Sequence, residues 1–130
     1  MSFEITGIHH IEFTVTDLEQ SKRFYSKFPG FKVVAEYPNF VMFQANEFYL
    51  GLTDHKGCVT NDKFSEFNVG LDHLAFGVSS LEDLREVASF LDSQKIPHSE
   101  INVLSNGTHI FTFRDPDNIQ LEFAYKPGIF

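Results

Sequence analysis

The stretch GIHHIEFTV (Gly7–Val15) is followed 63 residues later by GLDHLAFGV (Gly70–Val78), and each copy has a histidine in fourth place. At the same offset Leu18 corresponds to Leu81. Matches that recur at one fixed offset indicate an internal repeat, in which each copy is one structural unit. The chain is therefore expected to fold as two similar halves.

Each copy of the repeat is followed by a helix-start signal. Asp17 stands three residues before Gln20, and Ser80 stands three residues before Asp83, which is the spacing of an N-cap and its third helical residue. The apolar residues that follow recur at helical spacing, so we expect one helix per half with one buried face. The expected buried faces are Leu18, Ser21, Phe24, Tyr25 and Phe28 in the first half, and Leu81, Leu84, Ala88 and Leu91 in the second.

Three segments typical of strands follow each helix. The segments are 32–37, 40–44 and 48–53 in the first half, and 99–103, 109–114 and 119–125 in the second. The sequence DPDN (Asp115–Asn118) predicts a tight turn between the last two. Each half is thus predicted to be β-α-β-β-β, an α+β arrangement.

The segment between the halves, Asp54–Asn68, is rich in Gly, Asn, Asp and Ser and predicts a linker or a mobile lid. We expect a single domain over residues 1–130, with module one at about 5–54, a linker at about 55–69 and module two at about 70–126. A chain of this length can bury a substantial core.

Composition excludes several classes of partner. The formal net charge of −8 disfavours binding to nucleic acid and to anionic membranes. The sequence contains no apolar run long enough for a membrane helix and no signal-peptide pattern, so we expect a cytoplasmic protein that binds a small molecule. Cys58 is the single cysteine, which leaves no partner for an internal disulfide.

Three motifs resemble those of the vicinal oxygen chelate superfamily, which includes glyoxalase I, extradiol dioxygenases, and fosfomycin- and bleomycin-resistance proteins. The motifs are HHIEFTVTDLEQSKRFY, LDHLAFGV and FRDPDNIQLEF. The resemblance covers nearly the whole chain. It implies that two tandem βαβββ modules form a curved mixed sheet, a cup with the helices on its convex face, and that residues of the strands hold a metal ion on the concave side.

The alternation of side chains along a strand places His10, Glu12 and Thr14 on one face of the first strand. By the same parity His73 and Glu122 lie on the polar or small faces of their strands. Such residues can simply be polar side chains on the open face of a sheet. Their occurrence on equivalent faces of a repeat favours a metal site instead, and two imidazoles with one carboxylate suit a divalent first-row metal.

Carried over residue by residue, the resemblance implies that His10, His73 and Glu122 are the metal ligands. It implies one divalent ion per site, which could be Fe, Mn, Ni or Zn. The repeat pairs Glu122 with Gly51, which has no side chain to offer. Glyoxalase I enzymes typically carry a carboxylate or amide there, so this departure favours a three-ligand site like those of extradiol dioxygenases and fosfomycin thiol transferases. Gly51 marks either an open coordination position or a lost ligand.

Three further residues are candidates for catalysis. Glu12 lies two residues from His10 on the same face and could act as a general base. Tyr49 shares the parity of Gly51 and could polarise a bound oxygen, although an aromatic residue that only lines a pocket has the same pattern. His55 follows the fourth strand and could transfer a proton, or it could be an ordinary solvated histidine.

The sequence leaves two classes of function open. The first is a metal-dependent lyase, dioxygenase or transferase that acts on a small oxygen-chelating substrate. The second is a bleomycin-resistance-like protein that binds a small molecule without catalysis. The ligand triad favours the enzyme, whereas the acidic charge and the 16 Phe favour the binding protein. In both cases each module has open sheet edges, so we expect a homodimer.

Overall fold

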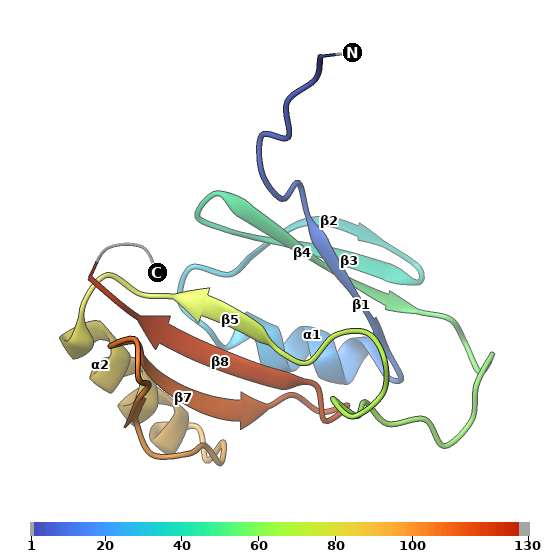
Figure 1. The fold of residues 1–130 in the computed structure, drawn as a ribbon. Coiled ribbons are helices and arrows are strands. Elements are labelled where there is room, and N and C mark those ends of the chain that lie inside the picture. Colours follow the sequence, from blue (N-terminus) through green and yellow to red (C-terminus); the bar gives the residue numbers. More distant parts are fainter. Residues whose placement is uncertain (1, 128–130) are drawn as a thin grey trace. The chain divides into compact units, whose positions relative to one another are not determined.

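The computed structural model describes residues 2–127. The chain divides into two compact units, module one (Met1–Asp62) and module two (Lys63–Phe130). Both have the element order β-α-β-β-β, and Figure 1 labels all of these elements except β6. The predicted α+β class and the predicted pair of βαβββ modules are confirmed.

Module one contains one helix and a four-stranded mixed sheet. Its elements are β1 (Ile11–Val15), α1 (Leu18–Ser26), β2 (Lys32–Tyr37), β3 (Phe40–Ala45) and β4 (Phe48–Asp54). The strand order is β1-β4-β3-β2, in which β1 runs parallel to β4 and the other neighbours are antiparallel. The first strand of the module therefore lies beside the last, and residues from both ends of the module share one sheet face.

Module two repeats this topology. Its elements are β5 (Leu74–Gly77), α2 (Leu81–Ser93), β6 (Asn102–Val103), β7 (His109–Arg114) and β8 (Gln120–Tyr125), in the strand order β5-β8-β7-β6. The predicted strand 99–103 is wrong in length, because the Oγ atom of Ser99 accepts a hydrogen bond from the Thr112 amide. This side chain takes the place of a backbone partner, and ladder pairing in β6 begins only at Asn102.

Both predicted helix starts are confirmed. The Asp17 carboxylate accepts a hydrogen bond of 3.1 Å from the Gln20 amide, and the Ser80 hydroxyl accepts one of 3.0 Å from the Asp83 amide. Each bond satisfies an amide that has no partner inside the helix. Within their own modules, α1 packs against β3 and β4, and α2 packs against β7 and β8.

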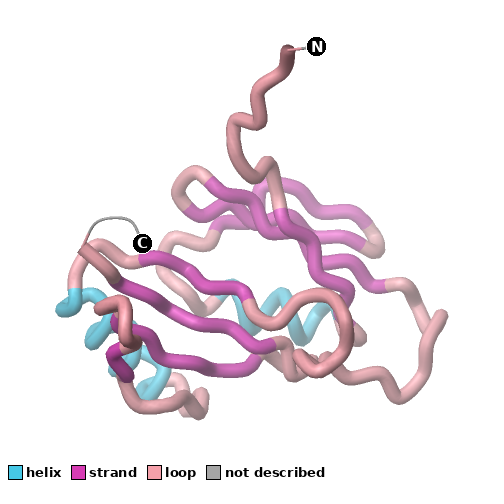
Figure 2. Tube along the Cα trace, viewed as in Figure 1, coloured by secondary structure: helices cyan, strands magenta, loops and turns pink. Residues whose placement is uncertain are grey.

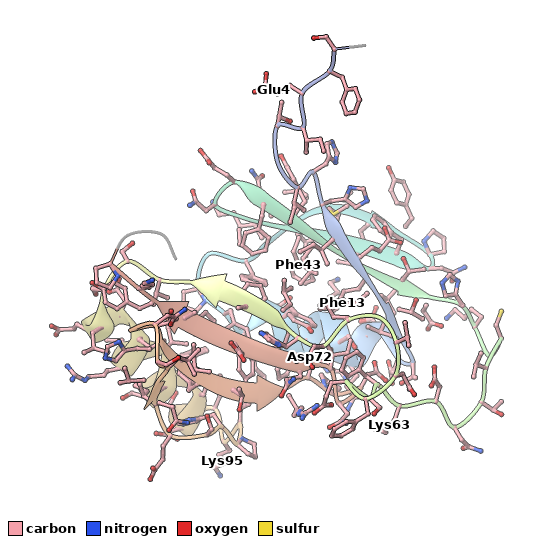
Figure 3. All side chains as sticks on the ribbon, viewed as in Figure 1. Glu4, Phe13, Phe43, Lys63, Asp72 and Lys95 are labelled. Atoms are coloured by element: carbon pink, nitrogen blue, oxygen red, sulfur yellow. The ribbon has the colours of Figure 1, made fainter. Side chains whose placement is uncertain are left out.

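Aromatic side chains fill much of the core of each module. In module one Tyr25 is 1% exposed, and its ring lies against Phe13 and Phe43, two residues labelled in Figure 3. In module two the rings of Phe111 and Phe123 stack, with centroids 5.7 Å apart. These rings and the buried leucines remove one face of each sheet from water. The opposite face remains available for polar side chains.

The repeat is visible in the backbone as well. Gly7 and Gly70, which are 63 residues apart, have φ angles of 146° and 141°. Only glycine adopts such angles without strain. Each copy therefore needs its glycine to bring the chain into the first strand of its module.

The long segment between β4 and β5 is drawn as loop in Figure 2 and contains neither helix nor strand, as its composition predicted. Arg114 holds part of this segment against module two, with a Glu66 oxygen 2.7 Å from its guanidinium. Neither α1 nor α2 is long and apolar enough to cross a membrane.

Candidate metal centre

The strongest candidate site lies on the polar face of module two, where β5 and β8 run side by side. His73 immediately precedes β5, and Glu122 lies in β8 opposite Ala75. The Nε2 atom of His73 is 3.4 Å from the Oε2 atom of Glu122, and the Glu122 side chain is 13% exposed. Parallel pairing of the first and last strands of the module brings these two predicted ligands together.

Two further side chains orient the His73 ring. The Oδ1 atom of Asp72 lies 2.6 Å from Nδ1 of His73, and the Gln120 amide donates hydrogen bonds to Asp72. A carboxylate only accepts hydrogen bonds, so Nδ1 carries a proton toward Asp72, and Nε2, which faces Glu122, is the nitrogen that a neutral ring offers to a cation. A carboxylate behind an imidazole in this way is the usual outer support of a metal-binding histidine.

The pair of donor atoms fits a cation. The pKa of the Glu122 carboxyl is raised, mainly by burial; a protonated His73 would lower it, and the negative charge of Asp72 adds to the rise. The facing Nε2 and Oε2 atoms are two electron-pair donors, which repel one another unless a cation or proton lies between them. Their separation is also close to the ~3.4 Å expected of two ligand atoms about 2.1 Å from a tetrahedral ion.

Module one presents a different arrangement around His10. His10 precedes β1 and is exposed, and its Nδ1 atom lies 3.0 Å from Nδ1 of His9. Tyr49 is half-buried one position before Leu50, the partner of Ile11, and therefore lies beside the His10 position in the neighbouring strand. No group of three or more His, Cys, Asp or Glu side chains suited to a metal is found within residues 2–127.

The space immediately beside Gly51 is occupied by neighbouring side chains. A Cβ atom at residue 51 would lie 3.0 Å from Cε1 of Phe40, 3.2 Å from Cγ of Glu12 and 3.4 Å from Oε1 of Glu12. The Glu12 side chain thus already fills the space that a side chain at 51 would use. Thr53 donates a hydrogen bond to the other Glu12 oxygen, Oε2.

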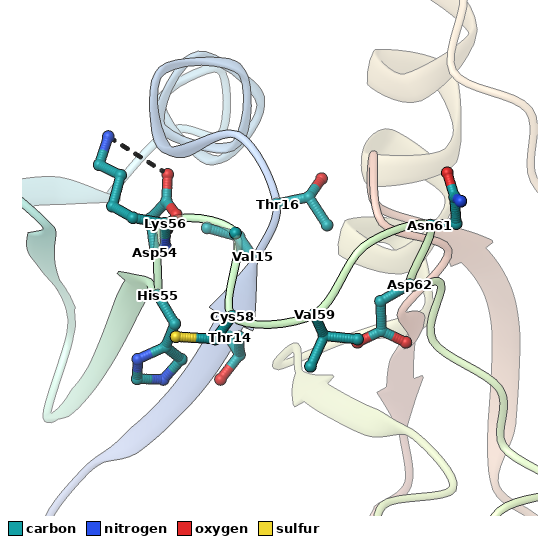
Figure 4. A pocket seen from close by; sticks show the side chains of 11 residues that line it. Thr14, Val15, Thr16, Asp54, His55, Lys56, Cys58, Val59, Asn61 and Asp62 are labelled. Carbon is teal, nitrogen blue, oxygen red and sulfur yellow. Dashed lines mark hydrogen bonds and ion pairs between the residues drawn. The ribbon is translucent and has the colours of Figure 1, made fainter.

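His55 lies away from His10. It lines a pocket of about 360 Å³ with Thr14, Asp54 and Cys58, beyond the carboxyl ends of β1 and β4 (Figure 4). His10 is at the opposite end of β1, and five residues of strand separate the two ends by about 16 Å. The structure therefore brings Glu12 and Tyr49 near His10 but does not bring His55 there.

The roles of Asp72 and Gln120 beside His73 were not predicted from the sequence. The roles of Gln120 and Thr53 depend on cross-strand register, which the sequence does not state. Asp72 had a signal, because the repeat pairs it with His9. The two copies of the repeat share a histidine, but the residue before it differs, which indicates that the two histidine rings have different hydrogen-bond partners.

Comparison with known proteins gives consistent matches. A family model described as Glyoxalase/Bleomycin resistance protein/Dioxygenase superfamily matches residues 7–123. The uncharacterized protein YqjT of Bacillus subtilis (strain 168) is 29% identical over 124 residues, which cover 90% of this chain and 97% of that protein.

Two solved structures extend the comparison. A glyoxylase/bleomycin resistance protein/dioxygenase domain from Frankia sp. EAN1pec is 30% identical with a TM-score of 0.84, over 95% of this chain and 94% of that one. A glyoxalase family protein from Enterococcus faecalis is 27% identical with a TM-score of 0.76, over 92% and 97% of the two chains. The match to the family model and both structures extend over most of the chain, including both repeats.

Proposed function

The chain belongs to the glyoxalase/bleomycin resistance protein/dioxygenase superfamily, and from this premise we propose that it is a divalent-metal-dependent enzyme acting on a small oxygen-chelating substrate. The superfamily includes lyases, dioxygenases and fosfomycin transferases, and its members often bind divalent metals. The observation that carries the proposal is the facing pair of His73 Nε2 and Glu122 Oε2, 3.4 Å apart, with Asp72 behind the ring.

Each protein group has a role in this proposal. His73 and Glu122 bind the ion, and His10 of module one is the third ligand. Asp72 keeps the proton of His73 on Nδ1, which leaves Nε2 free to coordinate. The Tyr49 hydroxyl orients a substrate oxygen near His10. When bound, a divalent ion supplies Lewis-acid stabilisation of negative charge on a substrate oxygen.

The test is metal content and metal affinity. Protein purified without chelator is expected to hold about one divalent ion per chain, measured by elemental analysis. In calorimetric titration with Mn²⁺, Fe²⁺, Ni²⁺ and Zn²⁺, His73→Ala, Glu122→Ala and His10→Ala should each lower the affinity by about tenfold or more. Two matched controls, His55→Ala and Glu86→Ala, remove exposed residues that are not among the proposed ligands, and they should leave the affinity unchanged.

The identity of the retained metal narrows the reaction. Iron points to oxygen chemistry, and manganese, nickel or zinc points to Lewis-acid chemistry. A wild-type protein that takes up none of the four metals contradicts the enzyme proposal. That result favours a metal-free binding protein, which calorimetry with a cationic aromatic ligand such as bleomycin would then test.

We also propose that the protein is a homodimer. In each module the edge strands pair on one side only, and β2 exposes Val33, Val34 and Tyr37. Unpaired edges with exposed apolar side chains are usually covered by a neighbour. Light scattering coupled to size-exclusion chromatography should give twice the chain mass of 14.9 kDa, and a concentration-independent monomer contradicts the proposal.

A further inference from the structure

We propose that Glu12 is a metal ligand and that it takes the ligand position left vacant by Gly51, from the neighbouring strand. This inference rests on the proposed function. It concerns the donor set that module one contributes to the metal site. The argument comes from the cross-strand register, the space around Gly51 and the hydrogen bond that holds Glu12.

The register shows that a carboxylate and a small residue have exchanged strands. In module two Ala75 on the first strand lies opposite Glu122 on the last strand. In module one Glu12 on the first strand lies opposite Gly51 on the last strand. Glu12 stands two residues after His10, as Ala75 stands two residues after His73. Each module therefore presents one imidazole and one carboxylate on the same sheet face.

The Glu12 side chain crosses onto the neighbouring strand. Its Cγ and Oε1 atoms lie 3.2 and 3.4 Å from the place of a Cβ atom at residue 51. A side chain at position 51 would therefore crowd the Glu12 side chain, whose carboxylate lies beside Gly51. Gly51 does not have a positive φ angle, so its backbone conformation does not require a glycine. The glycine instead makes room for Glu12 and for the ring of Phe40.

One oxygen of the Glu12 carboxylate is held in place. Thr53, two residues after Gly51 on the same face of β4, donates a hydrogen bond to Oε2 of Glu12. That bond fixes the carboxylate and leaves Oε1 on the Gly51 side, available to a metal. A hydrogen-bonded ligand carboxylate is typical of metal sites. Module one would then contribute one imidazole, that of His10, and one carboxylate, that of Glu12.

The experiment compares metal affinities by calorimetric titration with Mn²⁺ and Zn²⁺. Glu12→Gln keeps the size of the side chain and can still accept the hydrogen bond from Thr53, but it loses the charged donor. Its affinity should fall by about tenfold or more. The control Glu47→Gln removes an exposed carboxylate in the turn between β3 and β4 and should bind as the wild type does. Circular dichroism checks that each variant is folded.

A double variant tests the exchange itself. Glu12→Ala combined with Gly51→Glu returns the carboxylate to the last strand and empties the space that Glu12 occupied, so it should bind metal more tightly than Glu12→Ala alone. Replacing the metal with Co²⁺ gives a second readout. The visible absorption spectrum should change between the wild type and Glu12→Gln, because the ligand set differs.

The outcomes separate this inference from the proposed function. One outcome is that Glu122→Ala and His73→Ala lose metal affinity, whereas Glu12→Gln keeps the wild-type affinity and Co²⁺ spectrum. This result overturns the role of Glu12 and leaves the metal enzyme standing. Metal binding that none of these substitutions weakens overturns both. A double variant no better than Glu12→Ala, although folded, overturns the exchange of positions.

Discussion

The two modules share one backbone plan but support their histidines differently. In module two the Nδ1 atom of His73 is 2.6 Å from a carboxylate oxygen of Asp72. In module one the repeat-equivalent residue is His9, whose Nδ1 lies 3.0 Å from Nδ1 of His10. A carboxylate fixes the tautomer of its partner ring, whereas two imidazoles need only share one proton between them.

The modules also differ in which strand carries the carboxylate. Glu122 is on the last strand of module two and largely buried, whereas Glu12 is on the first strand of module one and exposed. Because the first and last strands are parallel neighbours in both modules, residues opposite one another on these strands lie side by side on one face. The comparison shows that each module keeps one imidazole and one carboxylate on the same sheet face, whereas the strand that carries the carboxylate differs between the modules.

The largest expected effect concerns equivalent leucines in the cores of the two modules. Leu50 and Leu121 are equivalent, and both are completely buried. Replacing either with Ala should lower the free energy of unfolding by about 2–5 kcal/mol, because a cavity remains. We expect a single domain, so in urea unfolding followed by circular dichroism both variants should shift one common transition. The control Leu104→Ala removes an exposed side chain and should have little effect. Separate transitions for the two variants would show independently folding modules.

The second prediction rebuilds the module-one arrangement inside module two. Glu122→Gly alone should reduce Mn²⁺ affinity by about tenfold or more, because a ligand is removed. Adding Ala75→Glu places a carboxylate on the opposite residue of β5 and should recover much of that loss. Calorimetric titration measures both. A double variant as weak as Glu122→Gly would show that strand position matters more than the shared space.

The third prediction exchanges the supports of the two histidines. Asp72→His gives His73 the neighbour that His10 has, and metal affinity should fall by roughly tenfold. His9→Asp gives His10 a carboxylate neighbour and should raise the metal affinity by a smaller factor, because the His10 ring already has a neighbour, the His9 ring, 3.0 Å from its Nδ1 atom. Calorimetry at pH 7 measures both affinities. Equal affinities in all three proteins would mean that neither neighbour orients its histidine.

The smallest expected effect concerns the ion pair that fastens the linker to module two. The hydrogen bond from Arg114 lowers the pKa of Glu66 from its ordinary value of 4.5 to about 2. A lowered pKa means that the contact stabilises the folded state above about pH 4.5 and is lost as the pH falls through about 2.

Hydrogen exchange of the Phe64 amide, which bonds to the Asp117 carbonyl, reports on this fastening. At pH 4 the wild type should keep its protection, and Glu66→Gln should exchange faster by roughly a few-fold, because exposed ion pairs contribute little. Glu47→Gln is the matched control. Equal exchange in Glu66→Gln and the wild type would show that the ion pair does not hold the linker.

Much of the fold could be predicted because its signals are local. The two N-cap residues Asp17 and Ser80 and the turn at Asp115 act within a few residues of where they stand, and the repeat can be recognised directly by comparing the two halves of the sequence. β6 was predicted too long, because the hydroxyl of Ser99 competes for the amide of Thr112 across the sheet. Strand propensity contains no information about such a partner.

The sequence by itself determined the duplication, the element order and the parity that puts His73 and Glu122 on one face. Only the tertiary structure decided which residues are opposite one another, because register depends on packing between strands that are distant along the chain. Register placed Asp72 and Gln120 behind His73 and set Glu12 opposite Gly51. Gly51, which appeared in the sequence as a missing side chain, leaves room in the folded module for the Phe40 ring and for the Glu12 side chain of the neighbouring strand.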